Sequence, residues 1–175
     1  MKAKLSCLFL GLLVIWAMKR YYSGANADDL WWILSPTALL AGGLTGASFH
    51  VESGAGYLSR ERLFLIEKSC AGVNFMIAAF GMLTVVLRRR ITSSASGAIV
   101  LGLSLLAGYS TAVIVNSGRI TIAMWLADHP LALSQLAPAQ IHRLEGVSVY
   151  FAGLVLLYEL VLWAERGTLS WRRRA

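Results

Sequence analysis

Glu67-Lys68-Ser69-Cys70-Ala71-Gly72-Val73-Asn74-Phe75 is the stretch in which a charged segment becomes a long apolar run. The run continues to Leu87 and stops at three consecutive arginines, Arg88 to Arg90. A helix needs roughly 20 residues to span the hydrocarbon core of a bilayer. We therefore predict a membrane helix over residues 71–87, with Cys70 at its N-terminal end and at the membrane surface. Unpaired backbone N–H groups at a helix N-terminus favour a thiolate over a thiol.

The composition of the whole chain agrees with a membrane protein. Of its 175 residues, 57% are hydrophobic and only 14% are charged, which is too apolar for a soluble domain of this size. The net charge of +7 comes from basic residues beside apolar runs, as expected at cytoplasmic helix ends, so membrane lipids and not nucleic acid are the predicted surroundings. The two cysteines, Cys7 and Cys70, do not form a disulfide framework. We predict a single integral membrane domain.

Five apolar runs predict an all-α, polytopic helical bundle with additional interfacial segments. The predicted transmembrane helices cover residues 5–18, 30–49, 71–87, 97–116 and 146–164.

Two polar regions between these runs are predicted to stay at the membrane surface. Residues 50–69 carry charges of both signs, and we expect a loop followed by a short interfacial helix. Within residues 119–145, the apolar piece 120–127 has about half the length needed to span, and Asp128-His129-Pro130 stops it. We predict that this region is interfacial or re-entrant and does not cross the bilayer.

The arginine runs set the predicted orientation. Arg88 to Arg90 and Arg172 to Arg174 mark cytoplasmic ends under the positive-inside rule. With five crossings, this orientation puts Lys19-Arg20 in the cytoplasm and the N-terminus outside. Cys70 then lies at the outer face, with Arg119 just past the outer end of the fourth span and His142 just before the fifth.

Cys70, Arg119 and His142 are the parts of a cysteine acyl-transfer site. A thiolate is the attacking species in such a site, and nearby cations favour it. The imidazole of His142 titrates near neutral pH, so it is able to accept a proton and return it to a leaving amine. The guanidinium of Arg119 offers a fork of donors, which suits either the thiolate or a developing oxyanion. The sequence leaves this choice open.

Other polar residues compete for a place in the site. Asn116 lies one helical turn before Arg119 and could orient the guanidinium, although a helix C-terminal cap is an equally good interpretation. Asn74 could line the same pocket or bond to a neighbouring helix. Glu145 could tune His142 or cap the fifth span. His129 and His50 are rival bases, and we expect His142 to be preferred.

The chain resembles the exosortase and archaeosortase family of membrane cysteine transpeptidases, and it is most similar to the short type called exosortase K. The resemblance rests on three blocks: Ser69-Cys70-Ala71-Gly72, Val115-Asn116-Ser117-Gly118-Arg119-Ile120, and His142 followed by Gly146. It implies that Cys70, Arg119 and His142 are catalytic. The chain departs from the family in having fewer spans than many relatives, and in Val115, where relatives often have alanine.

The resemblance also implies a substrate and a location. The substrates would be exported proteins that end in a short sorting motif, a transmembrane helix and a basic tail, and a thioester on Cys70 would pass to an acceptor. The protein would be a multi-pass protein of a bacterial cytoplasmic membrane with its active site facing outward.

A second functional class remains open from the residues alone. The chain could be a non-enzymatic membrane protein, such as a small transporter or an assembly partner, with the three polar residues as anchors. No metal or other cofactor is predicted, because the sequence lacks His-Glu-x-x-His, paired cysteines and a glycine-rich phosphate loop.

Overall fold

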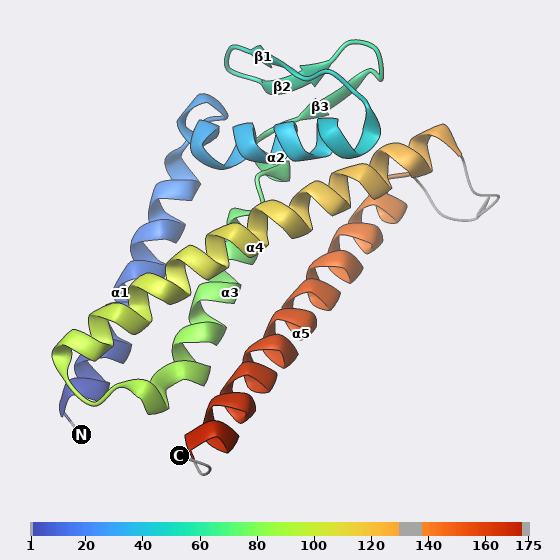
Figure 1. The fold of residues 1–175 in the computed structure, drawn as a ribbon. Helices are drawn as coiled ribbons and strands as arrows, with labels where there is room; N and C mark the ends of the chain where they lie inside the picture. The colour runs from blue at the N-terminus through green and yellow to red at the C-terminus, as the bar shows by residue number, and fades with distance from the viewer. Residues whose placement is uncertain (1, 130–137, 173–175) are drawn as a thin grey trace.

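The helices of the chain form a bundle with a small β-sheet across one end (Figure 1). The computed structural model describes residues 2–129 and 138–172, with the backbone alone at positions 2, 138, 139, 141, 142 and 167–172. The five α-helices of this part are α1 (Lys2–Gly24), α2 (Trp31–Thr45), α3 (Val73–Val86), α4 (Ser94–Asp128) and α5 (Pro138–Arg172). Short 3-10 helices are η1 (Asp28–Leu30), η2 (Lys68–Cys70) and η3 (Leu87–Arg90). The strands are β1 (His50–Glu52), β2 (Gly56–Ser59) and β3 (Phe64–Ile66).

Helix α3 is central and contacts α1, α4 and α5. Its contact with α4 is close because Gly108 has no side chain: a Cβ there would lie 3.2 Å from the Phe80 backbone nitrogen. Phe80 and Leu83 are almost fully buried in this part of the bundle. Small residues at a crossing allow two helix backbones to approach and gain dispersion contacts. The position of α3 in turn sets the position of Cys70, which immediately precedes it.

Within residues 2–129 and 138–172, three helices are long and apolar enough to cross a membrane. They cover Lys68–Arg90, Ser94–Asp128 and Arg143–Arg166, which include the predicted spans 71–87, 97–116 and 146–164. The chain is therefore a helical protein whose composition is compatible with a membrane. The predicted total of five crossings does not follow from the structure.

The predicted span over residues 30–49 is too long. Helix α2 has 15 residues and a length of about 22 Å, which is short of the roughly 30 Å hydrocarbon core, and it lies across the end of the bundle (Figure 1). It ends because Gly46 adopts a left-handed conformation with φ of +71°. The chain then folds back so closely that a Cβ at Gly42 would lie 2.7 Å from the Ala47 carbonyl oxygen.

The predicted interfacial helix within residues 50–69 is wrong, and so the all-α fold class needs a correction. This region forms an antiparallel sheet with the order β1-β2-β3, in which Val51 pairs with Tyr57 and Tyr57 pairs with Ile66. An apolar run such as residues 63–66 is too short for its hydrophobic periodicity to distinguish a helix from a strand. Tight turns favour the strands here, because Gly54 and Gly56 have positive φ values of +76° and +125°.

Helix α4 does not end at Asn116, where the predicted fourth span ends. Helix α4 begins at a capping box between Ser93 and Ser96 and continues for 35 residues to Asp128. No proline interrupts it until Pro130. Arg119 therefore lies inside a helix and not beyond its end. The predicted interfacial region 119–145 is divided between the last turns of α4, residues 130–137, which lie outside the described residues, and the start of α5.

The predicted direction of the first helix is wrong. Relative to the other helices, α1 runs the opposite way to the prediction. Lys19 Nζ donates a 2.7 Å hydrogen bond to Asn74 Oδ1 at the start of α3, and Cys7 packs against Gly97 near the start of α4. The N-terminus therefore lies at the same end of the bundle as Arg88 to Arg90, which we call the arginine end (Figure 1). Lys19 lies at the opposite end, which we call the cysteine end because Cys70 is there. Because α2 lies across the end of the bundle, α1 and α3 run in opposite directions (Figure 1).

Candidate active site

Cys70 ends the short helix η2 and is 6% exposed. Its backbone N–H donates to the Glu67 carbonyl oxygen at 2.9 Å, and α3 begins three residues later at Val73. The Ser69 hydroxyl lies 3.7 Å from Cys70 Sγ and donates a 2.6 Å hydrogen bond to a carboxylate oxygen of Glu67. The thiol thus lies just ahead of the N-terminus of an apolar helix, as the sequence predicted, but it is buried among neighbouring elements.

The loop that carries Cys70 is held against the end of α1. Lys68 Nζ donates to the carbonyl oxygens of Ser23 and Ala25 at 3.2 and 2.6 Å, and the Tyr22 hydroxyl donates to the Lys68 carbonyl oxygen at 3.1 Å. Lys68 thereby satisfies carbonyl groups that a helix end leaves unpaired. Burial raises the pKa of Tyr22, and the nearby Cys70 and Glu67 raise this pKa further, so its hydroxyl remains a donor at neutral pH.

Asn116 connects Cys70 to α4. Its side-chain amide is fully buried, and Nδ2 donates a short hydrogen bond to the backbone carbonyl oxygen of Cys70. The two elements approach closely at Gly72, where a Cβ would lie 3.2 Å from the Asn116 Cβ. Gly72 also has φ of +72°, a conformation that side-chain-bearing residues rarely adopt. Glycine is thus required at this position for two independent reasons.

Arg119 lies one turn beyond Asn116 on the same face of α4 and is 6% exposed. Its Nε donates to Asn116 Oδ1 at 3.3 Å, and the charge of its guanidinium interacts electrostatically with the Cys70 side chain. A Cβ at Gly146 would lie 3.2 Å from Arg119 Nη1, so the backbone of α5 passes directly over the guanidinium. Two of the three predicted catalytic residues are therefore neighbours.

His142, the third predicted catalytic residue, lies in the first turns of α5, one turn before Gly146. Its backbone falls within the described residues, but its side chain lies outside them. Positions 142, 146 and 150 are four residues apart and so share one face of the helix, the face that Gly146 and Tyr150 turn toward α4.

The predicted supporting residues separate into two groups. Asn116 joins Cys70 to Arg119, and half-buried Glu145 interacts electrostatically with the Arg119 guanidinium. Asn74, by contrast, is exposed and accepts the hydrogen bond from Lys19, which matches the alternative of bonding to a neighbouring helix.

The rival histidines lie on the surface. His129 stacks on Trp125 at 5.0 Å, and His50 begins strand β1; both are exposed. Within the described residues, no three His, Cys, Asp or Glu side chains form a group that could hold a metal ion.

Tyr150 is the residue of this site that sequence reasoning missed. Its hydroxyl donates a 2.7 Å hydrogen bond to Asn116 Oδ1, and its ring lies under the Arg119 guanidinium with 5.4 Å between Cζ and the ring centroid. The spacing of four residues from Gly146 and eight from His142 could have indicated it, because all three positions share a helix face. A tyrosine within an apolar run is otherwise read as an interfacial residue.

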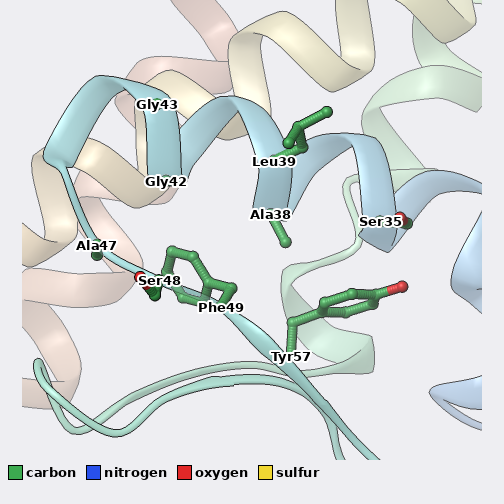
Figure 2. Close-up of a pocket in the computed structure, with 9 residues that line it drawn as sticks. All are labelled: Ser35, Ala38, Leu39, Gly42, Gly43, Ala47, Ser48, Phe49 and Tyr57. Atoms are coloured by element: carbon green, nitrogen blue, oxygen red, sulfur yellow. The ribbon is translucent and has the colours of Figure 1, made fainter.

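A separate cavity lies between α2 and the sheet at the cysteine end (Figure 2). It has a volume of about 390 Å³, and its wall is mostly apolar with small residues on the α2 side. The lining residues are Ser35, Ala38, Leu39, Gly42, Gly43, Ala47, Ser48, Phe49 and Tyr57. None of the predicted site residues is among them.

Comparison with protein-family models, with curated proteins and with solved structures finds no match to this chain. The function is therefore inferred from the residues and from their geometry.

Proposed function

We propose that this protein is a membrane cysteine peptidase or transpeptidase that cleaves exported proteins near their C-termini. The observation that carries the proposal is the hydrogen-bonded link from Cys70 through Asn116 to Arg119. The guanidinium is buried, interacts electrostatically with the thiol, and is tied through Asn116 to the backbone carbonyl of Cys70. An arginine inside an apolar helix is costly to bury, which makes a functional role the first explanation.

The reaction follows from the chemistry of these groups. The Cys70 thiolate attacks the carbonyl carbon of the scissile peptide bond, and a C–S bond forms. The C–N bond then breaks, and the leaving amine takes a proton from His142, which leaves a thioester on Cys70. Water or an acceptor amine attacks the thioester, gives up a proton to His142 and releases the Cys70 thiolate. Arg119 stabilises negative charge on the sulfur or on the carbonyl oxygen during these steps.

The proposed substrates are exported proteins that end in a short sorting motif, a transmembrane helix and a basic tail, as the resemblance to exosortases implies. The triple-arginine run supports this orientation. Cys7, three residues after Lys4, packs on Gly97, and Glu165, next to Arg166, pairs with Arg90. Lys4 and Arg166 therefore lie toward the arginine end with Arg88 to Arg90, and this end is cytoplasmic under the positive-inside rule. Cys70 would then face outward, where an exported protein is tethered by its last helix.

The test is processing of a candidate substrate in cells. A protein from the same genome with such a C-terminal tail is tagged at its N-terminus and co-expressed with the wild-type protein or with variants. We expect Cys70→Ala to leave the full-length form in the membrane, while the wild type converts it to a shorter form. Normal processing by Cys70→Ala would overturn the proposal.

Two further variants sharpen the test. Cys7 is equally buried, at 6%, but packs at the arginine end against Gly97, so Cys7→Ala is a matched control and should process normally. Arg119→Lys keeps the charge but loses the planar fork of donors and should fail. Full activity of Arg119→Lys would favour a non-enzymatic role in which Arg119 is only an anchor.

A further inference from the structure

Asn116 has only one orientation that satisfies its neighbours. Arg119 is a donor without acceptor capacity, so the Asn116 atom that faces Arg119 Nε must be the carbonyl oxygen. The amide nitrogen then faces Cys70, where it meets a backbone carbonyl, which only accepts. The Tyr150 hydroxyl donates the second hydrogen bond to Asn116 Oδ1, so the two lone pairs of that oxygen are both used.

Tyr150 has two simultaneous contacts with this pair. Its hydroxyl holds Asn116 at 2.7 Å, and the face of its ring lies 5.4 Å from the Arg119 guanidinium carbon, a cation–π distance. Phe75 of α3 packs against the Tyr150 ring, with 5.3 Å between the two ring centroids. A single side chain from α5 thus restrains the amide and the guanidinium that reach Cys70.

We propose that Tyr150 is a positioning residue that orients Asn116 and Arg119 toward Cys70. This inference rests on the proposed function for its catalytic meaning, because Tyr150 has no reacting atom of its own. Without the hydroxyl, Asn116 Oδ1 has one donor instead of two, and the amide and the guanidinium gain freedom to turn away. The position of α5 thereby determines whether the charge of Arg119 reaches the thiol.

The experiment measures the thiolate of Cys70 directly. Full-length protein is purified in detergent and brought to a series of pH values, and the ultraviolet absorbance of the thiolate at each pH is taken as the difference between each protein and its own Cys70→Ala derivative. That difference removes the contributions of Cys7 and of the tyrosines. We expect Tyr150→Phe, which keeps the ring, to lower the thiolate signal, and Arg119→Gln to lower it further because the cation is lost.

The matched control is Tyr158→Phe, the same substitution two turns further along α5 at an exposed tyrosine. It should leave the thiolate signal unchanged. An unchanged signal in Tyr150→Phe would overturn the inference, since a purely structural tyrosine would be replaced by phenylalanine without consequence. Elution as a single species in size-exclusion chromatography verifies that each variant is folded.

Two further readouts separate this inference from the proposed function. If Tyr150 acts through Asn116, the double variant Asn116→Ala/Tyr150→Phe should match Asn116→Ala alone, and an additional loss would contradict the inference. In the processing assay, Tyr150→Phe should lower the rate of substrate conversion about tenfold, the effect of one lost hydrogen bond. If Cys70→Ala processed the substrate normally, the proposed catalytic role of Cys70 would be wrong. The thiolate signal of the wild type and the Tyr150 variants would still test whether Tyr150 orients Arg119.

Discussion

The side-chain amide of Asn116 donates a hydrogen bond to the backbone carbonyl of Cys70, which joins the middle of α4 to the turn before α3. The two residues are 46 positions apart in the chain. Asn116 also accepts from Arg119 and from Tyr150, so one buried amide connects three elements at the candidate site. Buried polar networks of this kind lose much of their stability when one member is removed, because the remaining partners are left without hydrogen bonds.

Replacing Asn116 by alanine should therefore be more harmful than replacing Tyr150 by phenylalanine. Asn116→Ala removes the bonds to Cys70, Arg119 and Tyr150 together, and we expect processing to fall by more than about tenfold. The rate of substrate conversion measures the effect. The neighbouring Ser117→Ala is the control, because the Ser117 hydroxyl bonds to the Thr37 and Val113 carbonyls. Equal losses in both variants would contradict a specific role of Asn116.

Gly72 should not tolerate a side chain. Gly72→Ala places a Cβ at φ of +72°, which costs roughly 1–2 kcal/mol in the left-handed region, and brings it to 3.2 Å from Asn116. We expect a lower thermal unfolding midpoint in detergent and a loss of processing. The comparison is Gly102→Ala, an exposed position in α4 with no atom within 4 Å of the added Cβ, which should be as stable as wild type or more stable. A Gly72→Ala variant with wild-type stability would show that the turn is able to relax.

Close packing of α5 on α4 should be necessary for the site. A Cβ at Gly153 would lie 2.8 Å from a methyl carbon of Val115, so Gly153→Leu should push α5 away from α4 and from Arg119. The expected result is a loss of processing and of the Cys70 thiolate signal. Ala152→Leu adds the same bulk at the adjacent, exposed position and should have little effect on either measurement. Loss of activity in Ala152→Leu but not in Gly153→Leu would show that the face of α5 is wrongly assigned.

The N-terminus and the triple-arginine run should lie on one side of the membrane. In a protein with Cys7 and Cys70 replaced by alanine, single cysteines are introduced at four exposed positions: Lys4, Arg20, Arg62 and Arg89. A membrane-impermeant thiol reagent added to intact cells should label Arg20→Cys and Arg62→Cys but not Lys4→Cys and Arg89→Cys. Labelling of Lys4→Cys together with Arg62→Cys would restore the five-span orientation that the sequence predicts.

Residue patterns alone predicted the helical character of most of the chain and the apolar segments within α3, α4 and α5. A long apolar run bounded by charges reliably predicts a helix, because in an apolar environment the segment must satisfy its own backbone hydrogen bonds. Residues 30–49 and 50–69 were predicted less well. Helix α2 stops at Gly46 because of a local backbone conformation, and residues 63–66 form a strand only because β2 is there to pair with them.

The residues of the candidate site also divide into those that were predicted from the sequence and one that was not. Cys70 and Arg119 were identified from their residue types and from the family resemblance, and Asn116 from its spacing of three residues before Arg119. Tyr150 was not, because its partner Asn116 lies 34 positions away and on another helix. The residues around a tyrosine in an apolar run do not indicate a hydrogen bond to a partner so far away in the chain.

The sequence by itself determined where the long apolar helices lie and which reactive groups the chain contains, because helix formation and hydropathy depend on neighbouring residues. Only the tertiary structure decided that α4 runs past Arg119, that α1 has its N-terminus at the arginine end, and that Tyr150 and Asn116 meet beside Cys70. The meeting at Cys70 depends on three glycines: a Cβ at Gly72 or Gly146 would lie 3.2 Å from the Asn116 or Arg119 side chain, and a Cβ at Gly108 would lie 3.2 Å from the Phe80 backbone nitrogen. Such close approaches depend on how whole helices pack against one another, which the sequence of a single segment does not determine.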